Sequence, residues 1–150
     1  MNRSQRIPPW LLLCAAALVV LGCNRAEQTD VSVIGTVTAA GAPLSGAVIT
    51  LEPIAPTGGP NASVAVFDGR FRIGSDADLR GGRYRARVSM IPIEIRQSIP
   101  ANAVQSMPSG DVVIDPRFDA NSELVCELNV GQANRLDFSV DYLPIHQVKR

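Results

Sequence analysis

Apolar and polar residues alternate with a period of two over most of the stretch from Val31 to Tyr142. Glycine, proline and aspartate interrupt this alternation at short intervals. Because successive side chains of a β-strand point to opposite faces of a sheet, the alternation is typical of strands that bury one face. No segment after residue 30 keeps a helical period for three turns. The pattern predicts an all-β fold, a Greek-key β-sandwich of about seven strands.

Turn sequences divide the alternating stretch into runs. Asp68 and Gly69 separate two runs, which favours a tight β-hairpin. GQAN at 131–134 separates the last two runs, so a second hairpin is expected there. The expected strands are residues 31–38, 47–53, 62–67, 70–74, 82–90, 123–130 and 135–142. The buried stripe expected on the last of them is Leu136, Phe138, Val140 and Tyr142.

The segment from Ile91 to Asn121 does not fit this pattern. It contains four prolines and no long alternation, and only residues 111–114, DVVI, have the pattern of a strand. A long connection in a compact domain is usually functional or mobile. We therefore expect any specific recognition to lie here. The alternative is a crossing loop of the Greek key with one short extra strand.

The N-terminus has the pattern of a secretory signal that ends at a cysteine. Arg3 and Arg6 precede an apolar run, residues 10–22, that is shorter than the roughly 20 residues a spanning helix needs. Residues 20–23, Val-Leu-Gly-Cys, resemble the bacterial lipobox, in which the cysteine thiolate accepts the lipid. We expect Cys23 to be lipidated. The alternative is an ordinary signal peptide that leaves Cys23 as a free thiol.

This reading divides the chain into four parts and places it in the cell. The parts are a lipoprotein signal peptide (1–22), a lipidated N-terminus and tether (23–30), one domain (31–143) and a C-terminal tail (144–150). Two or three acyl chains, such as palmitate, hold a protein firmly, because each buried methylene contributes about 0.8 kcal/mol. The expected location is the cell envelope. Asn24 after the cysteine favours the outer membrane over the inner membrane.

Charge and cysteine content narrow the class of protein further. The chain has 14 basic and 14 acidic residues, and removing Arg3 and Arg6 with the signal leaves 12 against 14. Nucleic acid is therefore not an expected partner. With Cys14 removed and Cys23 acylated, Cys126 has no disulfide partner. Its alternating run predicts that Cys126 points into the core, and a reactive thiol is the alternative.

Three stretches resemble the carboxypeptidase regulatory-like domain, a transthyretin-like sandwich of many exported bacterial proteins. They are GTVTAAGAPLSGAVITLEP (35–53), FDGRFRIG (67–74) and GGRYRARVS (81–89). The stretch 115–142 is also similar to small planctomycete-type lipoproteins of this kind, in its Ser-x-Leu strand and its closing Gly-x-x-Asn. The matching residues are Gly35, Gly41, Pro43, Leu44, Gly46, Ala47, Asp68, Gly69, Phe71, Gly82 and Tyr84.

The resemblance implies a transthyretin-like or immunoglobulin-like fold and says little about activity, since turn glycines and a buried phenylalanine are residues of the fold. The chain has Val66 and Phe67 before Asp68, where the family often has Thr-Asp. Hydrolases that share the transthyretin fold need several histidines, and this chain has only His146. We therefore expect no catalytic residues, no cofactor and no enzyme activity.

Metal binding has little support in the sequence. A zinc site needs three or four ligands, which His146 and Cys126 do not supply. Asp76 and Asp78 suggest a calcium loop, with a polar turn as the alternative. The prediction is a chain without a metal site.

Arginines are the most distinctive surface feature that the alternation predicts. Arg70 and Arg72 share one face of a strand, and Arg83, Arg85 and Arg87 share one face of the next, so adjacent strands would gather five guanidinium groups. Such a ladder would suit an acidic polysaccharide or anionic lipid headgroups. The alternative is neutralisation across the sheet by outward-pointing acidic residues: Glu123, Glu127, Asp137 and Asp141.

The predicted function is therefore to support or bind other components of the cell envelope. We expect a non-catalytic module of the cell envelope, anchored in the membrane by lipid, that is structural or binds an envelope protein. The alternative is a module that binds carbohydrate or another polyanion. After residue 22 the chain has no tryptophan, since Trp10 is the only one, so a sugar site would depend on polar loops.

Overall fold

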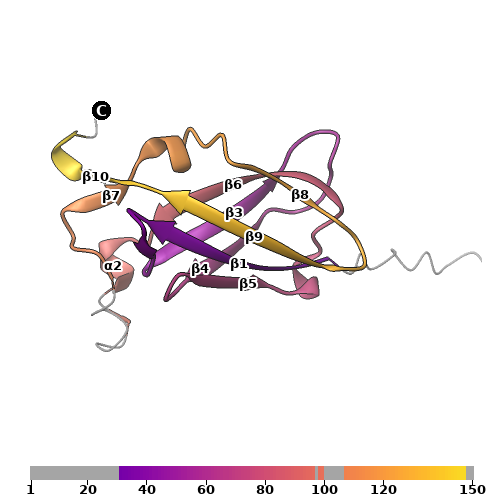
Figure 1. The fold of residues 1–150 in the computed structure, drawn as a ribbon, viewed down its shortest axis with the longest axis horizontal. Helices are drawn as coiled ribbons and strands as arrows, with labels where there is room; N and C mark the ends of the chain where they lie inside the picture. The colour runs from indigo at the N-terminus through magenta and orange to yellow at the C-terminus, as the bar shows by residue number, and fades with distance from the viewer. Residues whose placement is uncertain (1–30, 97, 100–106, 148–150) are drawn as a thin grey trace, which may run out of the picture.

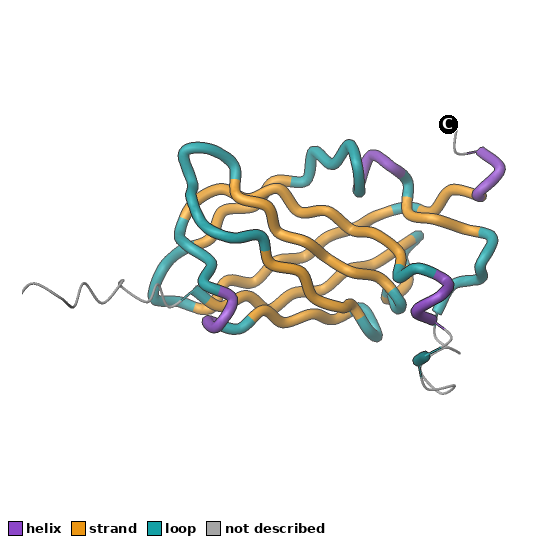
Figure 2. The backbone as a smooth tube through the Cα atoms, turned by 180° about the vertical axis from the view of Figure 1, so that it is seen from behind, coloured by secondary structure: helices purple, strands orange, loops and turns teal. Residues whose placement is uncertain are grey.

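The computed structural model describes residues 31–96, 98, 99 and 107–147. Regular structure in these residues is nearly all β, which confirms the predicted all-β class. Ten strands form in the described residues, and seven of them have four residues or more. Figure 2 shows helical structure only as short pieces beside the strands. These pieces are the turns η1 (Ser75–Ala77), α2 (Ile93–Arg96), η2 (Pro116–Phe118) and η3 (Ile145–Gln147).

The strands form two larger sheets and one short ribbon (Figure 1). Sheet A contains β1 (Ser32–Ala39), β2 (Ala42–Pro43), β5 (Arg70–Ile73) and β9 (Ala133–Val140). Sheet B has the order β4–β3–β6–β8 and is antiparallel throughout, with β3 (Ala47–Pro53), β4 (Ala62–Val66), β6 (Gly82–Met90) and β8 (Val125–Leu128). The ribbon pairs β7 (Val112–Ile114) with β10 (Tyr142–Pro144).

One hydrophobic core lies between the two sheets. The inward positions of β1 and of β3 and β6 alternate with exposed or half-buried positions, as period-two strands require. Tyr84 is fully buried, and its hydroxyl accepts a hydrogen bond from the Arg80 N–H at 2.9 Å. The large side chains that are almost wholly buried come from both sheets and the loops between them: Val31, Val33, Val37, Leu44, Ile49, Leu51, Val66, Leu79, Tyr84, Val88, Leu128 and Val140.

β1 is the central strand of sheet A. β5 and β2 pair with it antiparallel, one after the other, while β9 pairs with it in parallel from Ser32 to Ala39. Since β9 covers the full length of β1, β5 and β2 share its opposite edge. The first and the last long strands of the fold are therefore neighbours.

The Asp68–Gly69 turn forms as predicted, but the strands that it joins then separate. Both residues have positive φ, 51° and 70°, as a tight hairpin turn of the I′ kind requires. Phe67 and Arg70 form a single β-bridge beside the turn. Beyond it, β4 continues into sheet B and β5 into sheet A, so this turn connects the two sheets.

The expected hairpin at 131–134 does not form. β8 pairs with β6 in sheet B, whereas β9 pairs with β1 in sheet A, so the connection crosses the sandwich. Asn134, which is buried, holds this connection in place. Its side-chain oxygen accepts from the Asn129 N–H at 2.7 Å, and its amide donates to the carbonyls of Asn129 and Ser32 at 3.0 and 3.1 Å.

Gly35 and Phe71 explain how β1 and β5 pack together. Phe71 is buried, and its ring stacks against Phe138 with centroids 6.5 Å apart. A Cβ at Gly35 would collide with the Phe71 ring and with the carbonyl oxygen of Leu136. Glycine at position 35 therefore leaves the space that the Phe71 ring occupies between the sheets.

Candidate functional site

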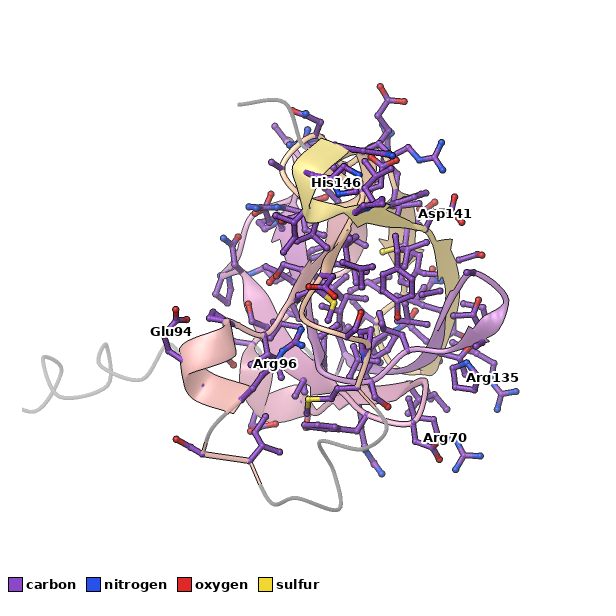
Figure 3. All side chains as sticks on the ribbon, turned by 90° about the vertical axis from the view of Figure 1, so that its left-hand side faces the viewer. Arg70, Glu94, Arg96, Arg135, Asp141 and His146 are labelled. Carbon is purple, nitrogen blue, oxygen red and sulfur yellow. The ribbon has the colours of Figure 1, made fainter. Side chains whose placement is uncertain are left out.

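The outer face of sheet A carries a group of exposed charged side chains. Thr36 on β1 lies between Arg70 on β5 and Asp137 on β9, and Ile34 lies between Arg72 and Arg135. These outward side chains form two cross-strand rows, here called the sheet A face: Arg72–Ile34–Arg135 and Arg70–Thr36–Asp137. Figure 3 shows Arg70 and Arg135 side by side at the same corner of the molecule, both directed outward.

The sheet A face contains a shallow hollow. Its volume is about 410 Å³, and it is lined by Ile34, Gly35, Thr36, Arg70, Arg135 and Asp137. The Thr36 hydroxyl donates to Asp137 Oδ1 at 2.6 Å across the β1–β9 pair. Within the described part of the chain, Arg70, Arg72 and Arg135 make no ion pair. The face therefore offers three guanidinium groups, one carboxylate and a partly apolar floor.

The predicted ladder of five arginines is wrong. β5 lies in sheet A and β6 in sheet B, so Arg70 and Arg72 belong to one sheet and Arg83, Arg85 and Arg87 to the other. The prediction failed because it assumed that strands consecutive in sequence are neighbours in one sheet. In fact the chain passes through η1 and changes layer between them.

Arg87 is the best-bound arginine on sheet B. Its guanidinium donates to Glu52 Oε1 and Asp119 Oδ1, both at 2.9 Å, and to the Asp119 carbonyl at 3.2 Å. The hydrogen bond to Glu52, followed by that to Asp119, raises the pKa of Arg87 above its usual value. Arg83 and Arg85 are exposed and have no ion-pair partner among the described residues.

Neutralisation of arginines by acidic residues does occur, but mostly with other partners than expected. Glu52 and Asp119 bind Arg87, and neither was among the acidic residues predicted for this role. Asp141 is paired, with Arg117 of η2. Glu127 lies opposite Arg83 in the β6–β8 register without an ion pair within 4 Å, and Glu123 is exposed.

Arg135 is the functional candidate that sequence reasoning missed. Its alternation with Leu136 already indicated an outward side chain. Its neighbours were assigned to the wrong strand, however, because the sequence placed β9 beside β8. Only the parallel β1–β9 pairing brings Arg135 to the same face as Arg72 and Arg70.

The segment from Ile91 to Asn121, the predicted recognition segment, is described in part, without residues 97 and 100–106. The strand expected at 111–114 is confirmed as β7. Arg96 donates to the carbonyls of Ile91 and Pro108 at 3.1 and 3.2 Å, which ties the start of the segment to its later part. Near the other end of the segment, Arg87 donates hydrogen bonds to the side chain and the carbonyl of Asp119.

A second hollow lies beside the end of this segment. Its volume is about 570 Å³, and its lining residues are Arg117, Phe118, Asn121, Glu123 and Leu124. The Arg117 guanidinium lies 4.6 Å from the centre of the Phe118 ring, a cation–π contact. Its charge is also balanced by Asp115 at 3.2 Å and by Asp141. Arg117 is therefore already occupied by groups of its own chain.

Cys126 is half-buried and packs against the core, as its inward prediction requires. Burial raises the pKa of its thiol from 9.0 to about 11, which suppresses the reactive thiolate at neutral pH.

His146 is exposed in η3, after the last strand. In the described residues, no three side chains from His, Cys, Asp and Glu gather as a metal site would require. Asp76 and Asp78 lie at η1, with Asp78 at its C-terminal cap.

Cys23 and the tether to residue 30 lie outside the described residues. Among the described helices, none has the length and hydrophobicity needed to span a membrane. Comparisons with protein-family models, with curated proteins and with solved structures found no match for this chain.

Proposed function

We propose that this chain is an exported lipoprotein whose β-domain is held at the cell envelope by acylated Cys23 and acts by contact, without catalysis. The observation that carries the proposal is the apolar run that ends in Val-Leu-Gly-Cys, eight residues before the first described residue, Val31. An extended tether of residues 23–30 spans at most about 26–29 Å, so the domain stays within roughly its own diameter of the bilayer.

The fold type that we propose is a transthyretin-like Greek-key sandwich. Its support is the positive-φ turn at Asp68–Gly69 and the packing of Phe71 over Gly35, at positions where the resemblance places them. These residues stabilise the fold, so the function that we propose depends on the surface residues instead. A contact module needs no reaction centre, and the outward positions of β5 and β9 are exposed.

Metabolic labelling with a clickable fatty acid tests the anchor. The wild-type chain is expected to take up label and to fractionate with membranes, with the outer membrane preferred. The Cys23→Ala variant is expected to lose both, because it has no thiol to acylate. Cys126→Ala is the matched control, since it removes the half-buried cysteine and should keep the label. Equal labelling of wild type and Cys23→Ala would rule the anchor out.

A second function, polyanion binding, is favoured by one observation: Arg70, Arg72 and Arg135 on the sheet A face form no ion pair with any residue that the structure describes. If that face binds polyanions, heparin resin should retain the domain at low salt and release an Arg70→Ala/Arg72→Ala variant earlier. The charge-matched control is Arg83→Ala/Arg85→Ala on sheet B, which should elute with wild type. Identical elution of all three proteins would remove this alternative.

A further inference from the structure

The free edge of β9 is the feature that suggests a partner. Among the described strands, β9 pairs only with β1, so its other edge is open along eight residues. The other edge strands of the two sheets, β4, β5, β8 and the two-residue β2, are shorter, with at most five residues each. Long open edges of this kind are usually protected, because their unpaired peptide groups bind any other strand.

The direction of the β9 peptide groups follows from its contact with β1. The Ala40 N–H donates to the Val140 carbonyl at 3.1 Å, so the backbone N–H and C=O of Val140 point toward β1. Peptide groups alternate in direction along a strand. Those of even-numbered residues therefore point to β1, and those of odd-numbered residues point to the open edge: Ala133, Arg135, Asp137 and Ser139. No hydrogen bond from the rest of the described chain reaches these four backbone groups.

β9 lacks most of the usual protections of an edge. Its sequence, ANRLDFSV, contains no lysine, proline or glycine. Its two charged side chains, Arg135 and Asp137, have opposite sign, are exposed and lie two residues apart. Leu136 between them points inward and remains partly exposed at the side of the sandwich. Such an edge does not repel a second strand of the same sequence.

We propose that β9 pairs antiparallel with β9 of a second copy of this chain, with the two-fold axis at Leu136. In this register Arg135 of each copy lies opposite Asp137 of the other, which gives two cross-strand ion pairs. Shifting the axis to Arg135 would place arginine against arginine. An axis at Asp137 would place aspartate against aspartate. Of these three registers, charge therefore favours the one centred on Leu136.

The backbone supports the same register. An axis at Leu136 pairs residue 135 with 137 and residue 133 with 139, and all four direct their peptide groups to the open edge. These are the pairs that exchange two hydrogen bonds in an antiparallel ladder. Their Cβ atoms would lie about 4.5–5.5 Å apart, within reach of an arginine–carboxylate ion pair. Leu136 would meet Leu136 of the second copy and bury its exposed part.

This inference rests on the proposed function in one respect, since it names the partner of a contact module as a second copy. Its test is independent of the lipid anchor. The chain from residue 23, with Cys23→Ser, contains every described residue of the fold. A reductant keeps Cys126 as a thiol. Size-exclusion chromatography with light scattering over a dilution series then measures the dimer directly.

Wild type is expected to form a dimer that dissociates on dilution. Arg135→Glu and Asp137→Arg, each alone, should weaken it by about tenfold or more, because two attractive pairs become repulsive. An equimolar mixture of the two variants should form a heterodimer, since both of its cross-strand pairs are again of opposite charge. Arg72→Glu, with the same charge change on β5, should dimerise as wild type does.

Three outcomes would overturn the proposal. The first is a wild-type chain that remains a monomer up to its limit of solubility, which would leave the edge to a different partner. The second is a mixture of the two variants that associates no better than each alone. The third is an Arg72→Glu variant that dissociates as readily as Arg135→Glu. Each differs from loss of fatty-acid labelling, which reports on Cys23 alone.

Discussion

Gly35 shows how the absence of one side chain makes room for a neighbouring one in this sandwich. A glycine in the middle of a strand normally weakens it, because it has no side chain to pack. Here the ring of Phe71 occupies the space that a Cβ at position 35 would take, and this ring stacks on Phe138. The position therefore requires glycine for space, although its φ is not positive.

Gly35→Ala is expected to lower the free energy of unfolding by about 1–3 kcal/mol, because the new methyl group overlaps Phe71 and the Leu136 carbonyl. Urea denaturation followed by circular dichroism measures this. Gly58→Ala is the matched control, since the nearest atom to its added Cβ lies 3.8 Å away on Arg80. Equal stability of Gly35→Ala and wild type would mean that Phe71 can move aside at no cost.

Cys126 makes the stability of the protein depend on pH in the alkaline range. Burial raises the pKa of its thiol in the folded state to about 11, above the ordinary value of 9.0. The unfolded state therefore loses this proton at lower pH than the folded state. The contribution of the neutral thiol to stability is complete below pH 9 and is lost as the pH rises toward 11.

Wild type should lose more stability than Cys126→Ala between pH 9 and 11, when both are unfolded in urea at each pH. Both proteins keep Tyr142, whose pKa is also raised by burial, so the difference between their slopes isolates the thiol. Below pH 8 the two curves should run parallel. Parallel curves up to pH 11 would show that the thiol is accessible to water in the folded state.

At the scale of elements, Arg87 joins three segments that are distant in the sequence. It projects from β6, binds Glu52 of β3, and holds Asp119 after η2 through both the side chain and the carbonyl. Ser122 adds a second link, since its hydroxyl donates to the Ala86 carbonyl in a buried position. The end of the 91–121 segment is therefore fixed to the outside of sheet B.

Arg87→Lys is expected to cost about 0.5–1 kcal/mol, because an ammonium group cannot reproduce the planar fork that reaches three acceptors, and the site is partly exposed to water. The thermal midpoint at low salt should fall, with a smaller difference from wild type at high salt. Arg85→Lys is the control on the same strand, where no ion pair is lost. An equally large fall of the thermal midpoint in Arg85→Lys would show that the effect does not depend on the ion pairs of Arg87.

At the scale of the whole molecule, both sheets and the β7–β10 ribbon contribute to one core. Tyr84 of sheet B is fully buried in this core, and the partly buried Tyr142 of β10 packs against it. A core shared in this way favours a single cooperative unfolding transition. The ribbon is then stabilised by the sandwich although it belongs to neither sheet.

Tyrosine fluorescence tests this cooperativity, because a chain that starts at residue 23 contains no tryptophan and only two tyrosines. Tyr84→Phe leaves Tyr142 as the reporter of the ribbon, and Tyr142→Phe leaves Tyr84 as the reporter of the core. In each variant the fluorescence midpoint should coincide with the midpoint from far-UV circular dichroism. An earlier fluorescence transition in Tyr84→Phe alone would identify the ribbon as a separate unit.

Local sequence was sufficient to predict the seven longer strands of this protein. Their approximate positions, their inward faces and the Asp68–Gly69 turn depend on neighbouring residues, so period and turn chemistry predicted them. β2 and β10 were not predicted, and the strand expected at 135–142 ends at Val140, so that Tyr142 lies in β10 and is only partly buried. β7 was predicted from four residues for the same reason. The N-terminal pattern that ends at Cys23 is likewise a local signal, which the structure of residues 31–147 does not test.

Which strands become neighbours was decided by the tertiary structure. The five arginines were expected on one face, and β8 and β9 were expected to pair, because sequence order was taken for spatial order. Both connections instead cross from one sheet to the other, since each sheet can bury its apolar face only against the other. The parallel β1–β9 pair joins residues about one hundred positions apart. That pairing places Arg135 beside Ile34, on the same face as Arg72, and leaves the outer edge of β9 open. No local pattern contains this information.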